Sequence, residues 1–281
     1  MDKVQMHALF AFLKTSCGLI VNEDKLYLVN SRLQPITEKY QCKTIAELVM
    51  RLTTSRNEDL KRDIIEAMTT NETSFFRDVT PFDHFKNHVI EKLLDRRRTK
   101  RSIRILCAAA SSGQEPYSLA MIMSENAGKL SGWRTDIIGV DIDTKILKRA
   151  EEGIYTSFEV QRGLPIQLLV KYFDKQTSQN WQVKPQIRSM VRFQKKNLLE
   201  PIRDLGQFDV IFCRNVLIYF DIPTKRVVLE RLADQLAPDG FLFLGGAETV
   251  FDITTRFVAA PGFRGMYVPT QGGAKPGAGV A

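Results

Sequence analysis

The spacing of apolar residues predicts that the chain begins with short amphipathic helices. In residues 22–36, apolar side chains recur every three or four positions, at Leu26, Val29, Leu33 and Ile36. Residues 57–68 repeat this spacing, and Asn22 and Asn57 stand where N-caps are expected. We therefore predict a small helical domain over residues 1–70.

The pattern changes after Ser102, where continuous apolar runs alternate with amphipathic segments. The runs "IRILCAAA", "TDIIGVDID", "FDVIFC" and "FLFLGGAE" read as buried strands. Helical patterns lie between them, and Gly153 is expected to close one of these helices. Strands that are apolar throughout and separated by helices predict an α/β fold, with a mostly parallel sheet covered on both faces. "RFVAA" and "GMYVP" indicate a closing β pair.

Two local patterns predict further elements. Thr80, Pro81 and Asp83 resemble a helix start, with the threonine as N-cap, the proline at the first helical position and the aspartate as the capping-box acid. Between residues 181 and 193, two short apolar groups predict a hairpin. They are Trp181 with Val183, and Met190 with Val191 and Phe193.

Composition agrees with an ordinary globular protein. The 281 residues are 44% hydrophobic and 26% charged, which suits one large and one small domain. No apolar run approaches the roughly 20 residues that span a bilayer, and the start lacks the pattern of a signal peptide. The four cysteines form no C-x-x-C pair, which argues against a zinc site or a disulfide scaffold. We expect a cytoplasmic protein without a metal.

The net charge of +8 is unevenly distributed. Residues 1–70 are close to charge balance, whereas "RRRTKRSIR" (Arg96 to Arg104) is strongly basic. This basic run is either a solvated helix end or a contact for an acidic protein or a phosphate.

Candidate chemistry gathers where the predicted strands end, which is where parallel sheets bind ligands. Small residues from Ala108 to Gly113 would let a ligand approach the backbone, and the next helix offers free N–H groups. The stretch is neither G-x-G-x-x-G nor a P-loop, which disfavours a dinucleotide or a triphosphate. Glu115 would attract a cationic ligand, or it balances the helix dipole.

Asp141, at the end of the second strand, resembles the acid that accepts hydrogen bonds from both ribose hydroxyls of a nucleoside. It could instead cap the next helix, although Asp143 is better placed for that role.

The strand that ends at Cys213 carries no Pro-Cys nucleophile and no [DN]-P-P-[YF] motif. Cys213 itself reads as a small core residue. The lack of an obvious base suits an acceptor that is already ionised, such as a carboxylate with a pKa of about 4.3. Such an acceptor needs positioning and charge balance rather than deprotonation.

Five motifs together resemble the CheR family of chemotaxis receptor glutamate methyltransferases. They are "NETSFFRD", "AAASSGQEPYSLA", "DIDTKIL" with the later "GIY", "FCRNVLIYF" and "LAPDGFLFLGGAE". The resemblance extends from the N-terminal helices to about Val268. It implies methyl transfer from S-adenosylmethionine (SAM) to receptor glutamate side chains, giving methyl esters and S-adenosylhomocysteine.

The resemblance also implies a division of the chain. Residues 1–70 would form the helical domain, and residues 71–79 a linker that contributes to the cofactor site. Residues 80–269 would form a class I SAM-dependent methyltransferase domain of Rossmann-like fold, with an inserted antiparallel β-subdomain at about 174–194. Residues 270–281, rich in glycine and alanine, are expected to be disordered.

Carried over by motif, the family's site residues fall on ten positions. The expected SAM contacts are Asn71, Thr73, Arg77, Glu115, Asp141, Asn197, Leu198, Asn215 and Val216. Asn197 and Leu198 would meet the adenine, and Asn215 and Val216 the methionine side. Arg77 and Tyr219 would lie beside the transferred methyl. Taken alone, Asn197 could be a turn residue and Tyr219 a core aromatic.

The expected partner is the cytoplasmic helical domain of methyl-accepting chemoreceptors, bound by a monomeric enzyme. Some family members also tether to a receptor pentapeptide through a glycine-containing loop of the inserted subdomain. The corresponding stretch, "FDKQTSQNWQVKPQIRSMVRFQ", has no glycine. The hypothesis is therefore that this protein does not depend on the tether. Two other functions stay open: a nucleic-acid methyltransferase, and a SAM-binding signalling scaffold without turnover.

Overall fold

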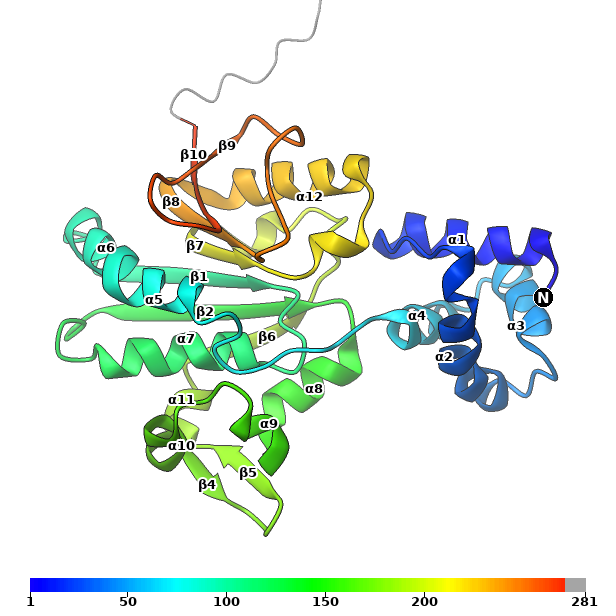
Figure 1. Cartoon of the computed structure of the whole chain (residues 1–281), viewed down its shortest axis with the longest axis horizontal. Helices are drawn as coiled ribbons and strands as arrows, with labels where there is room; N and C mark the ends of the chain where they lie inside the picture. Colours follow the sequence, from blue (N-terminus) through cyan, green and yellow to red (C-terminus); the bar gives the residue numbers. More distant parts are fainter. Residues whose placement is uncertain (271–281) are drawn as a thin grey trace, which may run out of the picture.

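The computed structural model describes residues 1–270. It contains a helical domain, a large α/β domain and a small sheet attached to the latter (Figure 1). The predicted disordered tail, apart from Thr270, lies outside the described residues.

The helical domain has its own core. It consists of α1 (Lys3–Cys17), η1 (Glu23–Lys25), α2 (Leu26–Lys39), α3 (Ile45–Thr54) and α4 (Glu58–Met68). Its apolar stripes meet in one buried cluster that includes Leu13, Val29 and Leu33. Asn57 caps α4, as predicted, because its side chain accepts a hydrogen bond from the Leu60 N–H at 3.0 Å. Asn22 occupies the predicted N-cap position, although of the 3₁₀ turn η1 that leads into α2, and its side chain makes no capping bond.

The α/β domain is built on a seven-stranded sheet in the order β6-β2-β1-β7-β8-β10-β9. Its strands are β1 (Ser102–Ala108), β2 (Arg134–Asp141), β6 (Val191–Lys195), β7 (Phe208–Cys213), β8 (Leu236–Leu244), β9 (Phe257–Ala259) and β10 (Met266–Pro269). The five strands from β6 to β8 run parallel to one another. At the edge of the sheet, β10 pairs antiparallel with β8, and β9 pairs antiparallel with β10. The mostly parallel sheet and the closing β pair are thus confirmed.

Helices cover both faces of this sheet. The covering elements are α5 (Thr80–His84), the π-helical turn η2 (Phe85–Val89), α6 (Ile90–Arg96), α7 (Gln114–Glu125), α8 (Thr144–Glu152) and α12 (Ile222–Gln235). Alternate residues of β1 belong to two different cores. Ile105 and Cys107 pack with the α5–α7 side, whereas Leu106 and Ala108 pack with α12. Two 3₁₀ turns, η3 (Arg203–Leu205) and η4 (Leu217–Tyr219), flank β7.

The small sheet differs from the predicted hairpin. It has the antiparallel order β3-β5-β4, formed by β3 (Ile154–Thr156), β4 (Phe173–Lys175) and β5 (Asn180–Val183). The helices α9 (Ser157–Gln161), α10 (Ile166–Tyr172) and α11 (Pro185–Arg188) accompany it. The hairpin prediction is wrong because α11 intervenes and Val191–Lys195 pairs with β2 of the main sheet instead.

The predicted helix start at Thr80 is also wrong in detail. Thr80 is the first residue of α5, and Val79 occupies the cap position without a side-chain bond. The chain arrives there through a tight turn with positive φ at Phe76, Asp78 and Val79. This turn leaves Thr80 no extended conformation from which its hydroxyl could cap the helix.

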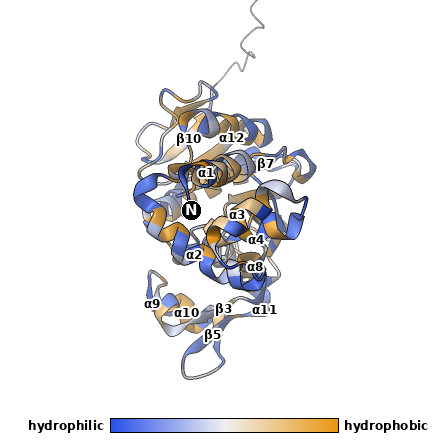
Figure 2. Ribbon diagram, turned by 90° about the vertical axis from the view of Figure 1, so that its right-hand side faces the viewer, coloured by the Kyte–Doolittle hydropathy of each residue, from blue (hydrophilic) through white to orange (hydrophobic). Residues whose placement is uncertain are grey.

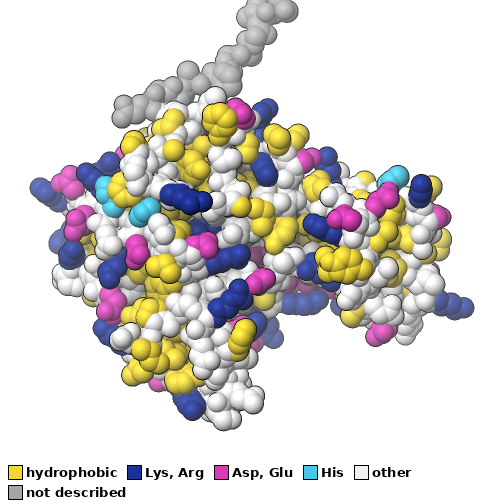
Figure 3. All heavy atoms as spheres, viewed as in Figure 1, with side chains coloured by type: hydrophobic (Ala, Val, Ile, Leu, Met, Phe, Trp, Pro, Cys, Tyr) yellow, Lys and Arg dark blue, Asp and Glu magenta, His cyan; other side chains and the backbone are white. Residues whose placement is uncertain are grey.

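The charged side chains on the face seen in Figure 3 are interspersed by sign rather than gathered into one basic patch. The predicted basic run is partly used in the fold. Arg97 pairs with Asp209 at 2.6 Å and with Asp239, and Arg104 pairs with Asp136 at 3.1 Å. The ribbon of Figure 2 shows hydrophobic residues on the elements of the helical domain as well as on those of the α/β domain, and each domain has its own buried apolar clusters.

Candidate active site

One pocket collects all ten residues that the sequence placed in the site. It lies beyond the carboxyl ends of β1, β2 and β7, where the helical domain meets the α/β domain. The predicted residues among those that line it are Asn71, Thr73, Arg77, Glu115, Asp141, Asn197, Leu198, Asn215, Val216 and Tyr219. The structure thus brings these ten side chains together at one pocket. Their contact with a cofactor stays a prediction.

Asp141 ends β2 with its carboxylate buried beneath the pocket. Its Oδ2 accepts a hydrogen bond from the Ser111 N–H at 2.8 Å, and its Oδ1 accepts one from the Asp143 N–H at 3.1 Å. Desolvation by burial raises the pKa of this carboxyl, against the opposing effect of the backbone N–H groups of Asp143, Ser111 and Ile142. Asp143 is the N-cap of α8, with bonds from Lys145 N and Ile146 N. Asp141 is therefore not the helix cap.

The loop after β1 has the shape that a closely approaching ligand requires. Ala109, Ser111 and Gly113 all have positive φ, which turns the chain sharply into α7. A Cβ at Gly113 would lie 3.0 Å from the Ala150 side chain, so this position has no room for a larger residue. The Tyr155 hydroxyl supports the loop from below by donating to the Ser112 carbonyl at 2.6 Å.

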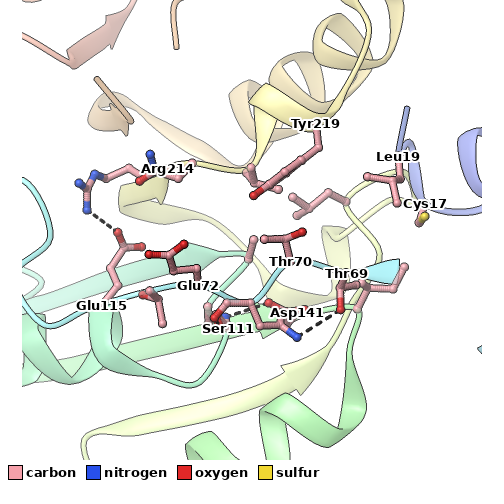
Figure 4. A pocket seen from close by; sticks show the side chains of 18 of the residues that line it. Cys17, Leu19, Thr69, Thr70, Glu72, Ser111, Glu115, Asp141, Arg214 and Tyr219 are labelled. Atoms are coloured by element: carbon pink, nitrogen blue, oxygen red, sulfur yellow. Dashed lines mark hydrogen bonds and ion pairs between the residues drawn. The ribbon is translucent and has the colours of Figure 1, made fainter. Parts of the chain in front are cut away.

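Glu115 lies in the first turn of α7 and faces Arg214 (Figure 4). The Arg214 Nη1 donates to Glu115 Oε2 at 2.9 Å. Burial raises the pKa of Glu115, and Arg214 opposes that shift. A carboxylate in this position fits a cationic group of a ligand better than a phosphate.

Arg214 is a residue to which the sequence analysis assigned no role. Its side chain is only 2% exposed. Besides Glu115, its Nη2 donates to Asp78 Oδ2 and to the Arg77 carbonyl, both at 2.7 Å. Its guanidinium also lies over the Phe82 ring, 5.5 Å from the centroid. Arg214 thus fastens the segment around Arg77 to the floor of the pocket.

The segment 71–79 crosses from the helical domain to the α/β domain (Figure 1). Phe75 is fully buried and packs edge-on against Tyr155 and Phe173, at centroid distances of 5.0 and 5.5 Å. The Phe76 N–H donates to the Ser118 hydroxyl at 3.1 Å. With this anchor, Asn71, Thr73 and Arg77 reach the pocket wall, which explains why the segment follows neither helical nor strand periodicity.

Asn71 is tied to the protein itself. Its side-chain Nδ2 donates to Asp143 Oδ2 at 2.8 Å and to the Thr69 hydroxyl at 3.2 Å, and its carbonyl accepts from the Ser111 hydroxyl at 2.9 Å. Asn71 therefore joins the crossing segment to the loops after β1 and β2, two of the loops that carry expected cofactor contacts.

The helical domain supplies part of the pocket that the sequence analysis missed. Cys17 and Leu19, at the end of α1, line it (Figure 4). Asn197 Nδ2 donates to the Ser16 carbonyl at 2.7 Å, and the Ile20 N–H donates to the Tyr219 carbonyl at 3.0 Å. No local pattern marks these residues, because only the docking of the two domains brings them to the site.

Family comparison follows the same division of the chain. Residues 71–265 match the family model described as CheR methyltransferase, SAM binding domain. Residues 5–69 match the model described as CheR methyltransferase, all-alpha domain. The chain belongs to the CheR methyltransferase family.

Curated relatives of this CheR-family chain cover most of its length. It is 42% identical over 243 residues to the chemotaxis protein methyltransferase Cher2 of Pseudomonas putida, covering 85% of this chain and 88% of the relative. It is also 42% identical over 250 residues to chemotaxis protein methyltransferase 1 of Pseudomonas aeruginosa, covering 88% and 90%. The family match supports SAM as the ligand of the pocket.

Two kinds of feature are absent from the described residues. Within residues 1–270, no helix combines the length and apolar character needed to cross a membrane. The same part of the CheR-family chain contains no cluster of three or more His, Cys, Asp or Glu side chains suited to hold a metal ion.

Proposed function

We propose that this protein transfers the methyl group of SAM to glutamate side chains of chemoreceptors, as a protein-glutamate O-methyltransferase in sensory adaptation. The observation that best supports this proposal is that Asp141, Glu115, Arg77 and Tyr219 line the same pocket. Membership of the CheR family and the names of its relatives support the same activity. We further propose that the protein acts in the cytoplasm, as a monomer and without a metal.

The residues of the pocket fit SAM group by group. The Asp141 oxygens have lone pairs left for the ribose hydroxyls, because the bonds from the Ser111 and Asp143 N–H groups use one lone pair of each oxygen. Glu115 offers a carboxylate to the ammonium group of the amino acid, and Asn197 with Leu198 forms the wall for the adenine. When bound, SAM supplies an electrophilic methyl group on a sulfonium.

The remaining work of the site is positioning. A glutamate carboxylate is ionised at neutral pH, so the protein does not need to remove a proton from it. Arg77 is a cation at the pocket wall and can orient the carboxylate by hydrogen bonds. We propose that Tyr219, which lines the same pocket, confines the acceptor beside the methyl group.

The proposal includes independence from a pentapeptide tether. The connection between β4 and β5 consists of residues 176–179 only, and neither strand nor connection contains a glycine. A short connection without glycine offers little freedom for the loop that other family members use. Low-micromolar binding of the receptor pentapeptide, measured by calorimetry, would contradict this part of the proposal.

The deciding experiment incubates the protein with tritiated SAM and receptor-bearing membranes. Base-labile label released as volatile methanol is the expected result, because methyl esters hydrolyse in base. Base-stable label in added RNA would instead support a nucleic-acid methyltransferase. SAM binding without label in either substrate would indicate a scaffold without turnover.

Within this assay, Arg77→Ala should abolish transfer while the protein still folds, because Arg77 lies at the pocket wall and outside the buried cores. Arg98→Ala is the matched control, since Arg98 is exposed and pairs only with the neighbouring Asp95 among the described residues. Turnover of Arg77→Ala at the wild-type rate would remove Arg77 from the mechanism.

A further inference from the structure

The loop that follows β7 is held from behind by a single carboxylate, that of Glu248, which is 9% exposed. Five backbone N–H groups donate to it. Val216, Leu217 and Ile218 reach Oε1 at 2.9, 2.7 and 3.3 Å, and Asn215 and Gly245 reach Oε2 at 2.8 and 2.7 Å. An ionised carboxylate only accepts hydrogen bonds, so it can satisfy a set of converging donors that no neutral side chain matches.

The backbone around this carboxylate is adapted to it at two points. Asn215 has φ 59°, a left-handed conformation that asparagine adopts more readily than most residues other than glycine. Gly245 has no side chain, and a Cβ there would lie 2.7 Å from Glu248 Oε2 and 3.0 Å from the Asn215 nitrogen. The end of β8 therefore leaves space for the carboxylate and for the turned loop at the same time.

The opposite side of this loop forms a wall of the pocket. Asn215, Val216 and Tyr219 all line the pocket. The backbone N–H groups of Asn215 and Val216 point away from it and donate to Glu248. We propose that Glu248 is a positioning residue for methyl transfer. It fixes Asn215 and Val216 against the methionine side of the cofactor and sets Tyr219 beside the acceptor. This inference rests on the proposed function.

Asp209 provides a comparison for a buried carboxylate with a purely structural role. It lies near the start of β7, the end of the strand remote from the pocket, and is 3% exposed. It accepts bonds from the Arg104 N–H at 2.8 Å and from Arg97 Nε at 2.6 Å. Loss of its charge should weaken the fold without changing the loop after β7.

The test compares Glu248→Gln with Asp209→Asn at a temperature where near-ultraviolet circular dichroism shows both to be folded. Glutamine keeps one acceptor oxygen, but its NH₂ must face N–H donors, so the loop loses charge-assisted bonds. For Glu248→Gln we expect S-adenosylhomocysteine to bind about tenfold more weakly or worse, and kcat on receptor membranes to fall at least about tenfold. The KM for receptor should stay within about twofold of wild type.

A second perturbation reaches the same loop without changing its charge. Gly245→Ala should reproduce both losses, because the added methyl displaces the carboxylate or the Asn215 backbone. It also keeps the test decisive if Glu248→Gln does not fold. Asp209→Asn should lower the melting temperature and leave the S-adenosylhomocysteine affinity and kcat unchanged.

Wild-type affinity and kcat in folded Glu248→Gln, or equal losses in Asp209→Asn, would overturn the positioning role. A wild-type protein that binds S-adenosylhomocysteine but methylates no receptor would refute the proposed function instead. The affinity measurements on the variants would then still decide the role of Glu248.

Discussion

The most direct test of the cofactor site is the change of Asp141 to asparagine. Asparagine has nearly the same shape as aspartate, so the end of β2 and the loop after β1 should keep their fold. What changes is the capacity to accept hydrogen bonds. The asparagine side chain would have one oxygen to offer, and its NH₂ group would face either the Ser111 N–H or the Asp143 N–H.

The expected loss of affinity follows from this inventory. The ionised carboxylate can accept one bond from each ribose hydroxyl, and a hydrogen bond to a charged group contributes about 1.5–3 kcal/mol. The asparagine keeps at most one such bond and makes it without charge. We therefore expect a loss of about 3 kcal/mol, or roughly a hundredfold in the Kd for S-adenosylhomocysteine measured by calorimetry.

The pH dependence of binding provides an independent readout. Burial raises the pKa of Asp141 above the ordinary value of 3.8, so the protonated form persists to higher pH than in an exposed aspartate. Ribose hydroxyls donate to the charged form, so affinity is complete above the raised pKa and is lost as the pH falls through it. Burial also raises the pKa of Glu115. Protonation of Glu115 should therefore lower the S-adenosylhomocysteine affinity at low pH in the wild type and in Asp141→Asn alike. Asp141→Asn should therefore remove only one part of the pH dependence.

Asp136→Asn is the matched control for this experiment. Asp136 lies near the other end of β2, where it pairs with Arg192 at 2.7 Å and Arg104 at 3.1 Å. Its change should lower stability and leave S-adenosylhomocysteine affinity intact. The reasoning is refuted if folded Asp141→Asn binds with the wild-type Kd, or if Asp136→Asn weakens binding to the same extent.

Three further predictions concern the contacts that hold the site together. Phe75→Ala should lower the free energy of unfolding by about 3–5 kcal/mol in urea titration, because it empties a fully buried aromatic position. Glu66→Gln should cost about 1–2 kcal/mol in the same assay, since Glu66 Oε1 accepts the Thr144 N–H at the start of α8. Asp221, with a pKa lowered to about 2 mainly by Lys14, contributes stability that is present above pH 3.8 and lost toward pH 2. Asp221→Asn should flatten that pH dependence, by less than about 2 kcal/mol because the pair is partly exposed.

Each of these predictions has its own control. Phe251→Ala should be nearly neutral beside Phe75→Ala, because Phe251 is 75% exposed. Glu91→Gln serves beside Glu66→Gln, since the one ion pair of Glu91 within residues 1–270 is an exposed pair with Lys129. For Asp221, an unchanged acid-unfolding midpoint in the asparagine variant would contradict the assigned role of the Lys14 pair.

The sequence predicted which residues converge on the pocket better than it predicted the elements around them. Strand ends of a parallel sheet meet at one edge, so Glu115, Asp141 and Asn215 could be expected to converge once the strands were recognised. The hairpin prediction failed because alternating apolar residues at 191–195 fit either sheet. The choice between them depends on pairing with β2, which periodicity does not encode.

The residues that were missed share one property, which is dependence on contacts distant in sequence. Cys17 and Leu19 carry no motif, and only the docking of α1 brings them to the pocket. Arg214 stands in a recognised motif, but its function follows from its burial and from its two carboxylate partners, Glu115 and Asp78. Such roles arise from the assembled fold and leave no periodic trace in the sequence.

The contacts between the domains argue that the helical domain is part of the proposed cofactor site. On one side, Glu66 and Thr69 bond to Thr144 and Asp143, immediately after the ribose-binding candidate Asp141. On the other side, the backbone at Ser16 and Ile20 bonds to Asn197 and Tyr219. The helical domain thus contacts both sides of the pocket. A displacement of this domain by a bound receptor would therefore move the adenine wall and the acceptor wall together, and cofactor affinity should respond to receptor binding.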